Sequence, residues 1–313
     1  MRLSLDAIAE AARSIDPVFL HSPQFRWDWF SEQFGIDLFV KVETLNPIRS
    51  FKGRGADYFI SRLPSGVTRV VAASAGNFGQ GLSYASRKRG IAVEMFAAEA
   101  ASPVKLEAMR RFGARLHLEG RDFDAAKLAG KAYAREHGLP YVEDGRDPSI
   151  SEGAGSIGVE LAPLDLDILL IPLGNGALLG GVARWMKAHS PKTRIIGVCA
   201  ASAPSMEQSW RRGEVVLTDT ADTIADGIGV RVPIPEAVED TRELMDECML
   251  IGDRRTRQAM STLLHRLGLV IEGSGAIGVA AARLMAREWR GLKVGTILCG
   301  GNLTPAHISQ INL

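Results

Sequence analysis

Cysteine is scarce in this chain. Only Cys199, Cys248 and Cys299 occur among the 313 residues, and they are widely spaced. They are too few and too scattered for a disulfide framework or for a Cys-x-x-Cys metal site. Such cysteine usage is typical of a reducing compartment, so we expect a cytoplasmic protein. The six histidines show no ligand spacing either, and we predict no metal site.

An excess of charge of one sign is also lacking. The formal net charge of +1 gives no electrostatic basis for binding nucleic acid or an anionic membrane. No stretch is long and apolar enough to span a bilayer, and the N-terminal segment lacks the apolar core of a signal peptide. Hydrophobic residues there recur instead with helical spacing, and Ser4 is placed to cap that helix. They are Leu5, Ile8, Ala12 and Ile15.

The sequence does contain a regular alternation of short apolar runs and longer helical patterns. We predict strands at Leu38–Val42, Arg69–Ala73, Val93–Ala97, Arg115–Leu118, Ile168–Leu173, Ile195–Cys199 and Val294–Leu298. We predict helices at Gly53–Arg62, Phe78–Arg89, Pro103–Phe112, Ala125–His137, Leu178–His189, Arg254–Leu267 and Ala276–Trp289. This alternation indicates βαβ units, and therefore an α/β fold with two open, twisted, mostly parallel sheets flanked by helices.

The predicted strands fall into two clusters, which indicates two lobes. A compact β-α-β-α-β series runs from Arg69 to Tyr141. The segment from Asp144 to Ala154 is rich in Gly, Asp, Pro and Ser, and we interpret it as a crossing between the lobes. We therefore assign residues 64–145 to a small domain, and residues 1–63 and 146–313 to a large one.

The most informative side chain is Lys52, in the segment 50–56 (SFKGRGA), where a loop is predicted to turn into a helix. A lysine there can reach a carbonyl compound and form a Schiff base. Most lysines are solvated surface charges, so Lys52 gains its significance from three further segments of small residues that follow in order.

The first of these, residues 74–81 (SAGNFGQG), lies between the apolar run 70–73 and a predicted helix. Small residues at a strand-to-helix turn leave backbone N–H groups free to bind an anion such as a carboxylate. A tight turn with a side-chain cap explains the same residues, so both interpretations remain open.

The second segment, residues 174–178 (GNGAL), follows an apolar strand and leads into a helix. Its backbone N–H groups can wrap a phosphate. It lacks the Gly-Lys-Ser/Thr ending of a P-loop, and Leu179 stands in the place of the last glycine of a dinucleotide motif. A single phosphate group is therefore the expected ligand of this segment.

The third segment begins at Cys299 and follows the predicted strand 294–298. It lies at the carboxyl end of a strand, where parallel sheets present groups that contact ligands. A small buried thiol with a purely structural role is the alternative interpretation.

The four features together describe a pyridoxal phosphate site that acts on an amino acid. They are a lysine, a cradle for one phosphate, a cradle for a carboxylate and a weak hydrogen-bonding group. From Phe19 to Asn302 the sequence resembles the fold type II, tryptophan-synthase-β-like, pyridoxal-phosphate enzymes, and within them the serine/threonine dehydratases. The resemblance includes residues 50–56, 223–227 (TIADG) and 272–276 (EGSGA). It implies a homodimer in which the cofactor lies in the cleft between the large, cofactor-binding domain and the small domain.

The resemblance also implies a role for each matching residue. Lys52 holds the cofactor through a Schiff base and later moves the α-proton, and Phe51 packs near the ring. Asn77 donates a hydrogen bond to the cofactor's phenolic oxygen, and Cys299 faces the pyridine nitrogen. The phosphate is bound by backbone groups of Gly174, Asn175, Gly176, Ala177 and Leu178. The substrate carboxylate is cradled by Ser74, Ala75, Gly76, Asn77 and Phe78.

The implied activity is β-elimination from a β-hydroxy-L-amino acid such as threonine or serine, which yields a 2-oxo acid and ammonia. The neutral thiol of Cys299 cannot hold a pyridinium proton as a carboxylate would, and this favours elimination over transamination. Ala75 stands where related racemases have a catalytic serine, so we expect weak racemisation at best. Phe78 stands where many dehydratases have histidine, and either a different substrate or family drift explains it.

Two other functions stay open. A β- or γ-replacement enzyme such as threonine synthase is possible, but such enzymes more often carry aspartate where Gly53 follows the lysine here. A catalytically silent protein that binds an amino acid is disfavoured by the intact Lys52. The stretch 199–205 has no carboxylate for a divalent cation, and the short tail after Asn302 leaves no room for a regulatory domain. Glu272 either approaches the cofactor or serves as a helix-entry carboxylate.

Overall fold

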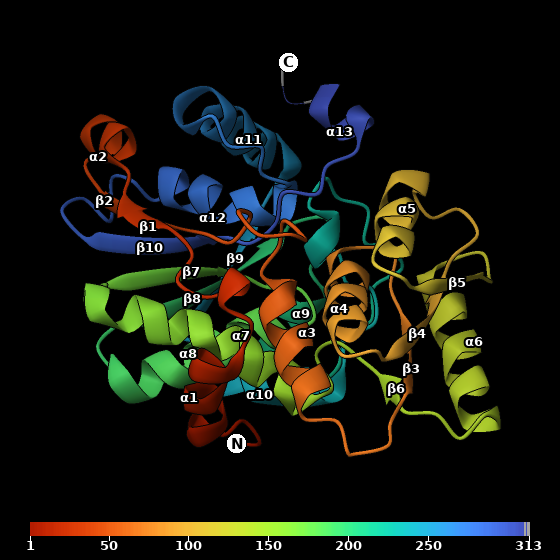
Figure 1. Cartoon of the computed structure of the whole chain (residues 1–313). Helices are drawn as coiled ribbons and strands as arrows, with labels where there is room; N and C mark the ends of the chain where they lie inside the picture. Colours follow the sequence, from red (N-terminus) through yellow and green to blue (C-terminus); the bar gives the residue numbers. More distant parts are fainter. Residues whose placement is uncertain (310, 312–313) are drawn as a thin grey trace.

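The computed structural model describes residues 1–309 and 311, and they form an α/β protein with two sheets (Figure 1). The six-stranded sheet has the order β1-β2-β10-β7-β8-β9, and the four-stranded sheet has the order β5-β4-β3-β6. The strands pair in parallel, except that β1 is antiparallel to β2. The predicted fold class is therefore confirmed.

All of the predicted strands are present, with ends that differ by at most one residue. The six-stranded sheet contains β1 (Gln24–Arg26), β2 (Asp37–Val42), β7 (Ile168–Pro172), β8 (Arg194–Ala200), β9 (Glu247–Ile251) and β10 (Lys293–Leu298). The four-stranded sheet contains β3 (Arg69–Ala73), β4 (Ala92–Ala97), β5 (Arg115–Leu118) and β6 (Tyr141–Val142). Strands β1, β6 and β9 were not predicted from the sequence.

The predicted helices are also present, and the N-terminal one is capped as expected, since Ser4 Oγ accepts the N–H of Ala7 at 3.3 Å. The α-helices are α1 (Leu5–Ser14), α2 (Asp28–Phe34), α3 (Lys52–Ser61), α4 (Asn77–Lys88), α5 (Pro103–Arg111), α6 (Phe123–Glu136), α7 (Pro148–Leu161), α8 (Ala177–His189), α9 (Ser205–Arg212), α10 (Pro235–Arg242), α11 (Asp253–Leu267), α12 (Gly273–Leu284) and α13 (Pro305–Ser309). Short 3₁₀ turns are η1 (Pro17–Phe19), η2 (Ala162–Leu164) and η3 (Asp226–Ile228).

Two expectations were wrong in part. The segment from Asp144 to Ala154 is a connection only at its start, because α7 begins at Pro148 and continues to Leu161. Proline suits the first turn of a helix, where its missing N–H costs no hydrogen bond. The helix predicted at Ala276–Trp289 also differs, since it begins at Gly273 and ends at Leu284.

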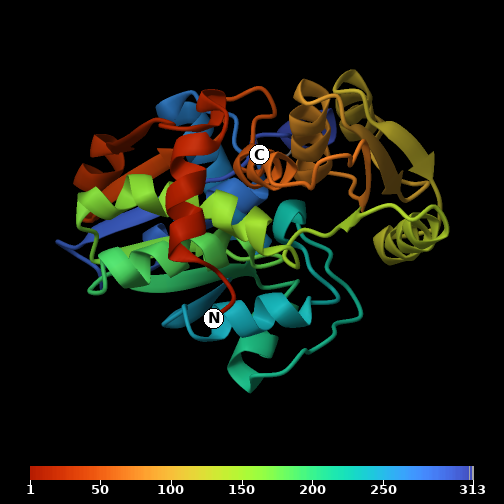
Figure 2. The same cartoon turned by 60° about the horizontal axis from the view of Figure 1, so that its bottom comes forward.

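The six-stranded sheet is covered on both faces. Helices α11 and α12 lie on one face, and α7 and α8 lie on the other with α1 packed outside them (Figures 1 and 2). The burial of β7 on both faces explains why its sequence is continuously apolar. Ile168 and Leu170 point into the core below α12, whereas Leu169 and Ile171 point into the core beside α8. A strand buried on both faces needs no polar alternation.

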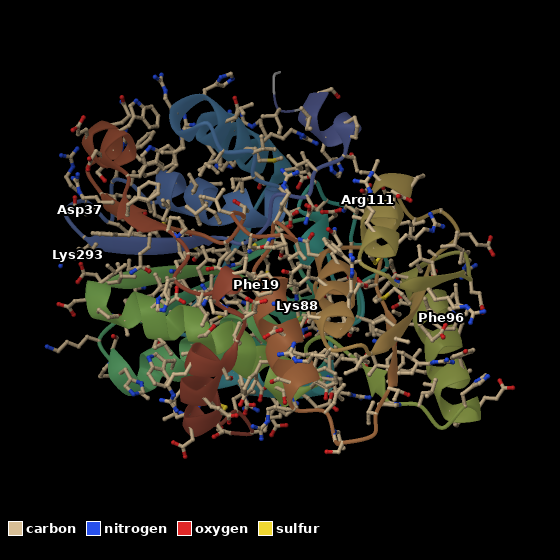
Figure 3. The ribbon with its side chains drawn as sticks, viewed as in Figure 1. Phe19, Asp37, Lys88, Phe96, Arg111 and Lys293 are labelled. Atoms are coloured by element: carbon tan, nitrogen blue, oxygen red, sulfur yellow. The ribbon has the colours of Figure 1, made fainter. Side chains whose placement is uncertain are left out.

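The four-stranded sheet is covered in the same way. Val70 and Ala72 of β3 pack with α4 and α5, whereas Val71 and Ala73 face α6. Phe96 of β4 fills the space between the sheet and α6 (Figure 3). Within the described residues, no helix combines the length and the apolar character that crossing a membrane would require.

Segments near both ends of the chain meet in the six-stranded sheet. Asp37 of β2 lies beside Lys293 of β10 in the parallel register (Figure 3). The chain leaves this sheet after α3, forms the four-stranded sheet, and returns with α7. This path brings the carboxyl ends of strands from both sheets to the two sides of one cavity.

Candidate active site

The four segments singled out from the sequence line one cavity of about 600 Å³. Three of them follow β3, β7 and β10 within two residues, and the fourth carries Lys52 at the start of α3. The carboxyl ends of parallel strands are where α/β sheets bind ligands. The cavity has the size of a typical small-molecule site.

The start of α3 is tied to the Cys299 segment by two hydrogen bonds to one main-chain carbonyl. The N–H of Phe51 and the hydroxyl of Ser50 both donate to the carbonyl of Cys299, at 3.0 and 3.1 Å. Behind the lysine, α4 approaches so closely that a Cβ at Gly81 would lie 3.0 Å from the carbonyl oxygen of Lys52. The lysine backbone is therefore fixed between the two sheets.

The side chain of Lys52 ends against a carboxylate that was not predicted. Its Nζ lies 2.5 Å from Asp144 Oδ2 and 4.7 Å from the centre of the Phe51 ring. Both members of the ion pair are mostly buried, with side chains 14% and 12% exposed. Asp144 follows Glu143 just beyond the carboxyl end of β6. Because β6 was not predicted from the sequence, the position of Asp144 at a strand end was not recognised.

The segment 74–78 forms a capped turn that opens α4. Ser74 Oγ accepts the N–H groups of Gly76 and Gly79 at 3.2 and 3.0 Å. A Cβ at Gly76 would meet no atom within 4 Å, so the backbone there is open to the cavity. The turn interpretation is therefore correct, and it is compatible with an anion site formed by the same backbone.

Asn77 is held in place by a hydrogen-bonded group of buried side chains. Its Nδ2 donates to Glu272 Oε1 at 2.8 Å, and its Oδ1 accepts from Asn302 Nδ2 at 2.9 Å. Glu272 Oε2 accepts the N–H of Asn302 at 3.0 Å. Burial, with a smaller effect of the Asp226 charge, raises the pKa of Glu272 to about 6. Glu272 thus lies both at the entry of α12 and beside the cavity.

The loop 174–178 runs from β7 into α8. Gly176 has a φ of 85°, a conformation that other residues rarely adopt, whereas neither Asn175 nor Ala177 has a positive φ. A Cβ at Gly174 would lie 2.9 Å from Cα of Ile228. The two glycines that remain in this loop are therefore the ones that its backbone requires.

Cys299 closes the cavity at the end of β10. The side chain is 3% exposed, and burial raises the pKa of the thiol well above its usual range. A thiol held in its protonated form presents a weak hydrogen-bonding group. Cys199 and Cys248 lie apart from the cavity lining, buried in the core on the α8 side of the six-stranded sheet.

Two ion pairs at the cavity join helices that flank the four-stranded sheet to the segment around η3, and they were not predicted from the sequence. Lys105 of α5 pairs with Asp226 of η3, and Arg231 Nε donates to Asp124 Oδ2 of α6 at 3.0 Å. Single charges on the surface carry no sequence signal for such contacts. In the part of the chain that the structure describes, no group of three His, Cys, Asp or Glu side chains is arranged to hold a metal ion.

Comparison with known proteins gives consistent matches. The family model described as pyridoxal-phosphate dependent enzyme matches residues 15–300. An L-threonine ammonia-lyase of Geobacter sulfurreducens is 36% identical over 288 residues, which cover 90% of this chain and 71% of the relative. The processed threonine deaminase isoform 2 of Solanum lycopersicum superposes with a TM-score of 0.92 at 28% identity, covering 99% of this chain and 88% of the other. Maize serine racemase gives a TM-score of 0.93 at 26% identity, covering 99% and 97%.

Proposed function

The chain belongs to the pyridoxal-phosphate-dependent enzymes of fold type II, and from that premise we propose that it is an ammonia-lyase for a β-hydroxy-L-amino acid such as threonine or serine. The products are a 2-oxo acid and ammonia. The observation that carries the proposal is the meeting of Lys52, the turn 74–78, the loop 174–178 and Cys299 around one cavity. The similarity to an L-threonine ammonia-lyase over 90% of the chain supports the reaction type.

The residues present fit pyridoxal phosphate. Lys52 reaches the cavity from the start of α3, and the start of α8 supplies backbone donors for a single phosphate. Cys299 offers a neutral group for the ring nitrogen, and Asn77 offers an amide for the phenolic oxygen. When bound, this cofactor withdraws electrons from the α-carbon of an amino acid and makes the α-hydrogen acidic.

The chain's own residues then supply position and proton transfer. Lys52 Nζ removes the α-proton as the general base. The turn 74–78 binds the substrate carboxylate through backbone N–H groups at the start of α4, where the helix dipole favours an anion. Phe51 packs beside the reacting centre, and Phe78 makes the carboxylate side of the pocket apolar.

The choice between reactions is set by two side chains. A neutral Cys299 thiol leaves the ring nitrogen without a carboxylate, which limits negative charge at the α-carbon and favours loss of the β-group. Ala75 has no group that could deliver a proton from the opposite face, so racemisation is weak.

The proposal also covers the division into domains, the oligomeric state and the location of the protein. Residues 64–145 act as a small domain that binds the substrate carboxylate, and residues 1–63 and 146–313 act as a large domain that binds the cofactor. The active form is a homodimer in the cytoplasm, without nucleic acid, membrane or metal partners.

The test is release of 2-oxo acid by the purified, cofactor-loaded protein from a panel of L-β-hydroxy amino acids. The panel contains serine, threonine, 3-hydroxyaspartate and phenylserine. Release from at least one member is expected, and the Lys52→Ala variant should show neither release nor the Schiff-base absorbance. Absorbance changes without oxo acid from any member would instead favour a replacement enzyme or a binding protein.

A further inference from the structure

Asp144 is the cavity carboxylate whose side-chain partner is Lys52. Its Oδ2 contacts Lys52 Nζ at 2.5 Å, and its Oδ1 is buried without a hydrogen-bond partner among the described residues. A buried carboxylate oxygen without a donor is unfavourable, and native structures usually supply one. The unpaired oxygen therefore indicates a place where a bound molecule supplies the donor.

The other acidic side chains of the cavity have partners of their own. Glu143 pairs with Lys127 and Lys131, Asp226 pairs with Lys105, and Asp124 pairs with Arg231. Asp122 accepts the N–H of Ala125 at 2.9 Å, and Glu272 accepts from Asn77 and Asn302. Among the cavity carboxylates, Asp144 alone depends on the lysine that the cofactor needs.

The balance of charge points the same way. Acidic side chains at the cavity outnumber basic ones, six to four. The basic residues are Lys52, Lys105, Lys127 and Arg231. A site that must accept a phosphate and a carboxylate would be expected to carry an excess of positive charge. The excess of negative charge instead favours a ligand that brings positive charge of its own.

The backbone holds Asp144 firmly. Gly145 has a φ of 88°, and a Cβ there would lie 2.4 Å from the carbonyl oxygen of Asn175 in the phosphate loop. The carbonyl of Gly145 accepts from Arg2 Nη2 at 2.9 Å. On the other side, the N–H of Glu143 donates to Asp147 Oδ2 at 3.3 Å. The backbone that carries the carboxylate is thus held by contacts that do not involve Lys52.

We propose that Asp144 determines substrate choice by binding a positively charged amino group on the β-carbon of the substrate. Lys52 must reach the α-carbon, so a carboxylate 2.5 Å from its nitrogen is close enough to the reacting centre to contact a substituent of the neighbouring β-carbon. The inference rests on the proposed function, which it extends from β-hydroxy to 2,3-diamino acids. Asp144 then replaces its contact with Lys52 by a contact with the substrate ammonium.

The reaction of a 2,3-diamino acid balances without an added acid. Lys52 takes the α-proton, a double bond forms between the α- and β-carbons, and the bond from the β-carbon to nitrogen breaks. The electron pair of that bond leaves with the nitrogen, which is already protonated as an ammonium and departs as ammonia. Water then hydrolyses the released enamine, after its tautomerisation to an imine, to the 2-oxo acid and a second ammonia.

The test compares L-2,3-diaminopropionate with L-serine, which has a similar size and a neutral β-substituent. Dissociation constants are measured on the cofactor-loaded protein by stopped-flow absorbance before turnover, together with rates of oxo acid release. We expect the wild type to bind the diamino acid more tightly. In Asp144→Asn, the ratio of the two affinities should fall by roughly 10- to 100-fold, as expected for loss of a hydrogen bond to a charged group.

Asp226→Asn is the matched control, because it removes a cavity carboxylate that has its own partner in Lys105. Its affinity ratio should change by less than about threefold. Equal loss of affinity for both ligands in Asp144→Asn would overturn the inference and leave Asp144 as a partner of Lys52 only. Equal binding of both ligands by the wild type would overturn it too. Absence of oxo acid from every β-hydroxy acid would reject the proposed function, while the affinity ratio would still decide the role of Asp144.

Discussion

The lysine helix rests on a buried network of charges, and this network allows a prediction of stability. Arg54, on α3, donates to Glu43 at 2.9 and 2.8 Å and to Glu160 at 2.6 Å. Glu160 also pairs with Lys41. Arg54 and Glu43 are fully buried, Lys41 is 1% exposed and Glu160 is 10% exposed. Removal of one member leaves the charge of another without its partner, which is costly in a buried site.

The pKa of Glu160 gives the magnitude. Burial alone would raise this pKa, but the hydrogen bonds and charges of Arg54 and Lys41 lower it from 4.5 to about 2. At about 1.4 kcal/mol per pH unit, this corresponds to about 3 kcal/mol of stability at neutral pH. Because the folded-state pKa lies below the ordinary value, the contribution is complete above pH 4.5 and is lost as the pH falls toward 2.

The assay is urea unfolding of wild type and Glu160→Gln at one protein concentration, at pH 7 and pH 3. We expect the variant to lose about 3 kcal/mol at pH 7 and clearly less at pH 3. The control is Glu247→Gln, because Glu247 pairs with Arg194 on the surface with both side chains about half exposed. That variant should lose less than about 1 kcal/mol. Equal losses for the two variants at pH 7 would refute the reasoning.

Three further predictions concern the cavity. Gly176→Ala forces a side chain onto a φ of 85°, so the loop should be strained by about 1–2 kcal/mol and cofactor affinity, measured by absorbance titration, should fall; unchanged affinity would contradict this. Gly81→Ala places a Cβ 3.0 Å from the carbonyl oxygen of Lys52, and thermal unfolding should show destabilisation by about 1–3 kcal/mol. In the comparison variant Gly90→Ala, the added Cβ has no atom within 4 Å, so the only cost should be the strain of its positive φ. The pKa of Glu272 is raised above its ordinary value, so stability from this group is complete below pH 4.5 and about 2 kcal/mol is lost as the pH rises through 6. Glu272→Gln should abolish this slope in urea titrations of the cofactor-free protein, and parallel slopes would show that another group is responsible.

Much of the fold was accessible from the sequence because its strands are short apolar runs between helical patterns. β7 and β10 are buried on both faces, and their continuous apolar residues identify them directly. β6 contains only Tyr141 and Val142, and such a short strand shows no periodicity. β9 contains a run of four apolar residues, 248–251, but a run this short does not distinguish a strand from part of a buried helix.

Helix α7 was missed for a different reason. Its glycines favour a loop when propensity alone is considered. In the structure they allow α7 and α8 to touch, because a Cβ at Gly155 or Gly158 would lie 2.9 Å from the carbonyls of Gly181 and Val182. Close helix packing is a tertiary property that a single sequence does not display.

The candidate site also has a part that could be predicted from the sequence and a part that could not. Lys52, the turn 74–78 and the loop 174–178 each lie in a local pattern of small residues at the start of a helix, so they were visible. Asp144 and the rim pairs Lys105–Asp226 and Arg231–Asp124 come together only through folding. Their side chains are ordinary surface types in the sequence, and only their mutual distances reveal a role.

The pairing of β2 with β10 also has a consequence for how the protein is made. β2 and the lysine helix leave the ribosome long before β10, which lies between β2 and β7 in the sheet. Until Leu298 has emerged, β2 has only β1 as a neighbour in its sheet, and the lysine helix can pack only on the four-stranded sheet, through Ala56 and Ile60. The nascent chain therefore carries every earlier part of the site without completing it, and cofactor capture is expected only after β10 has been synthesised.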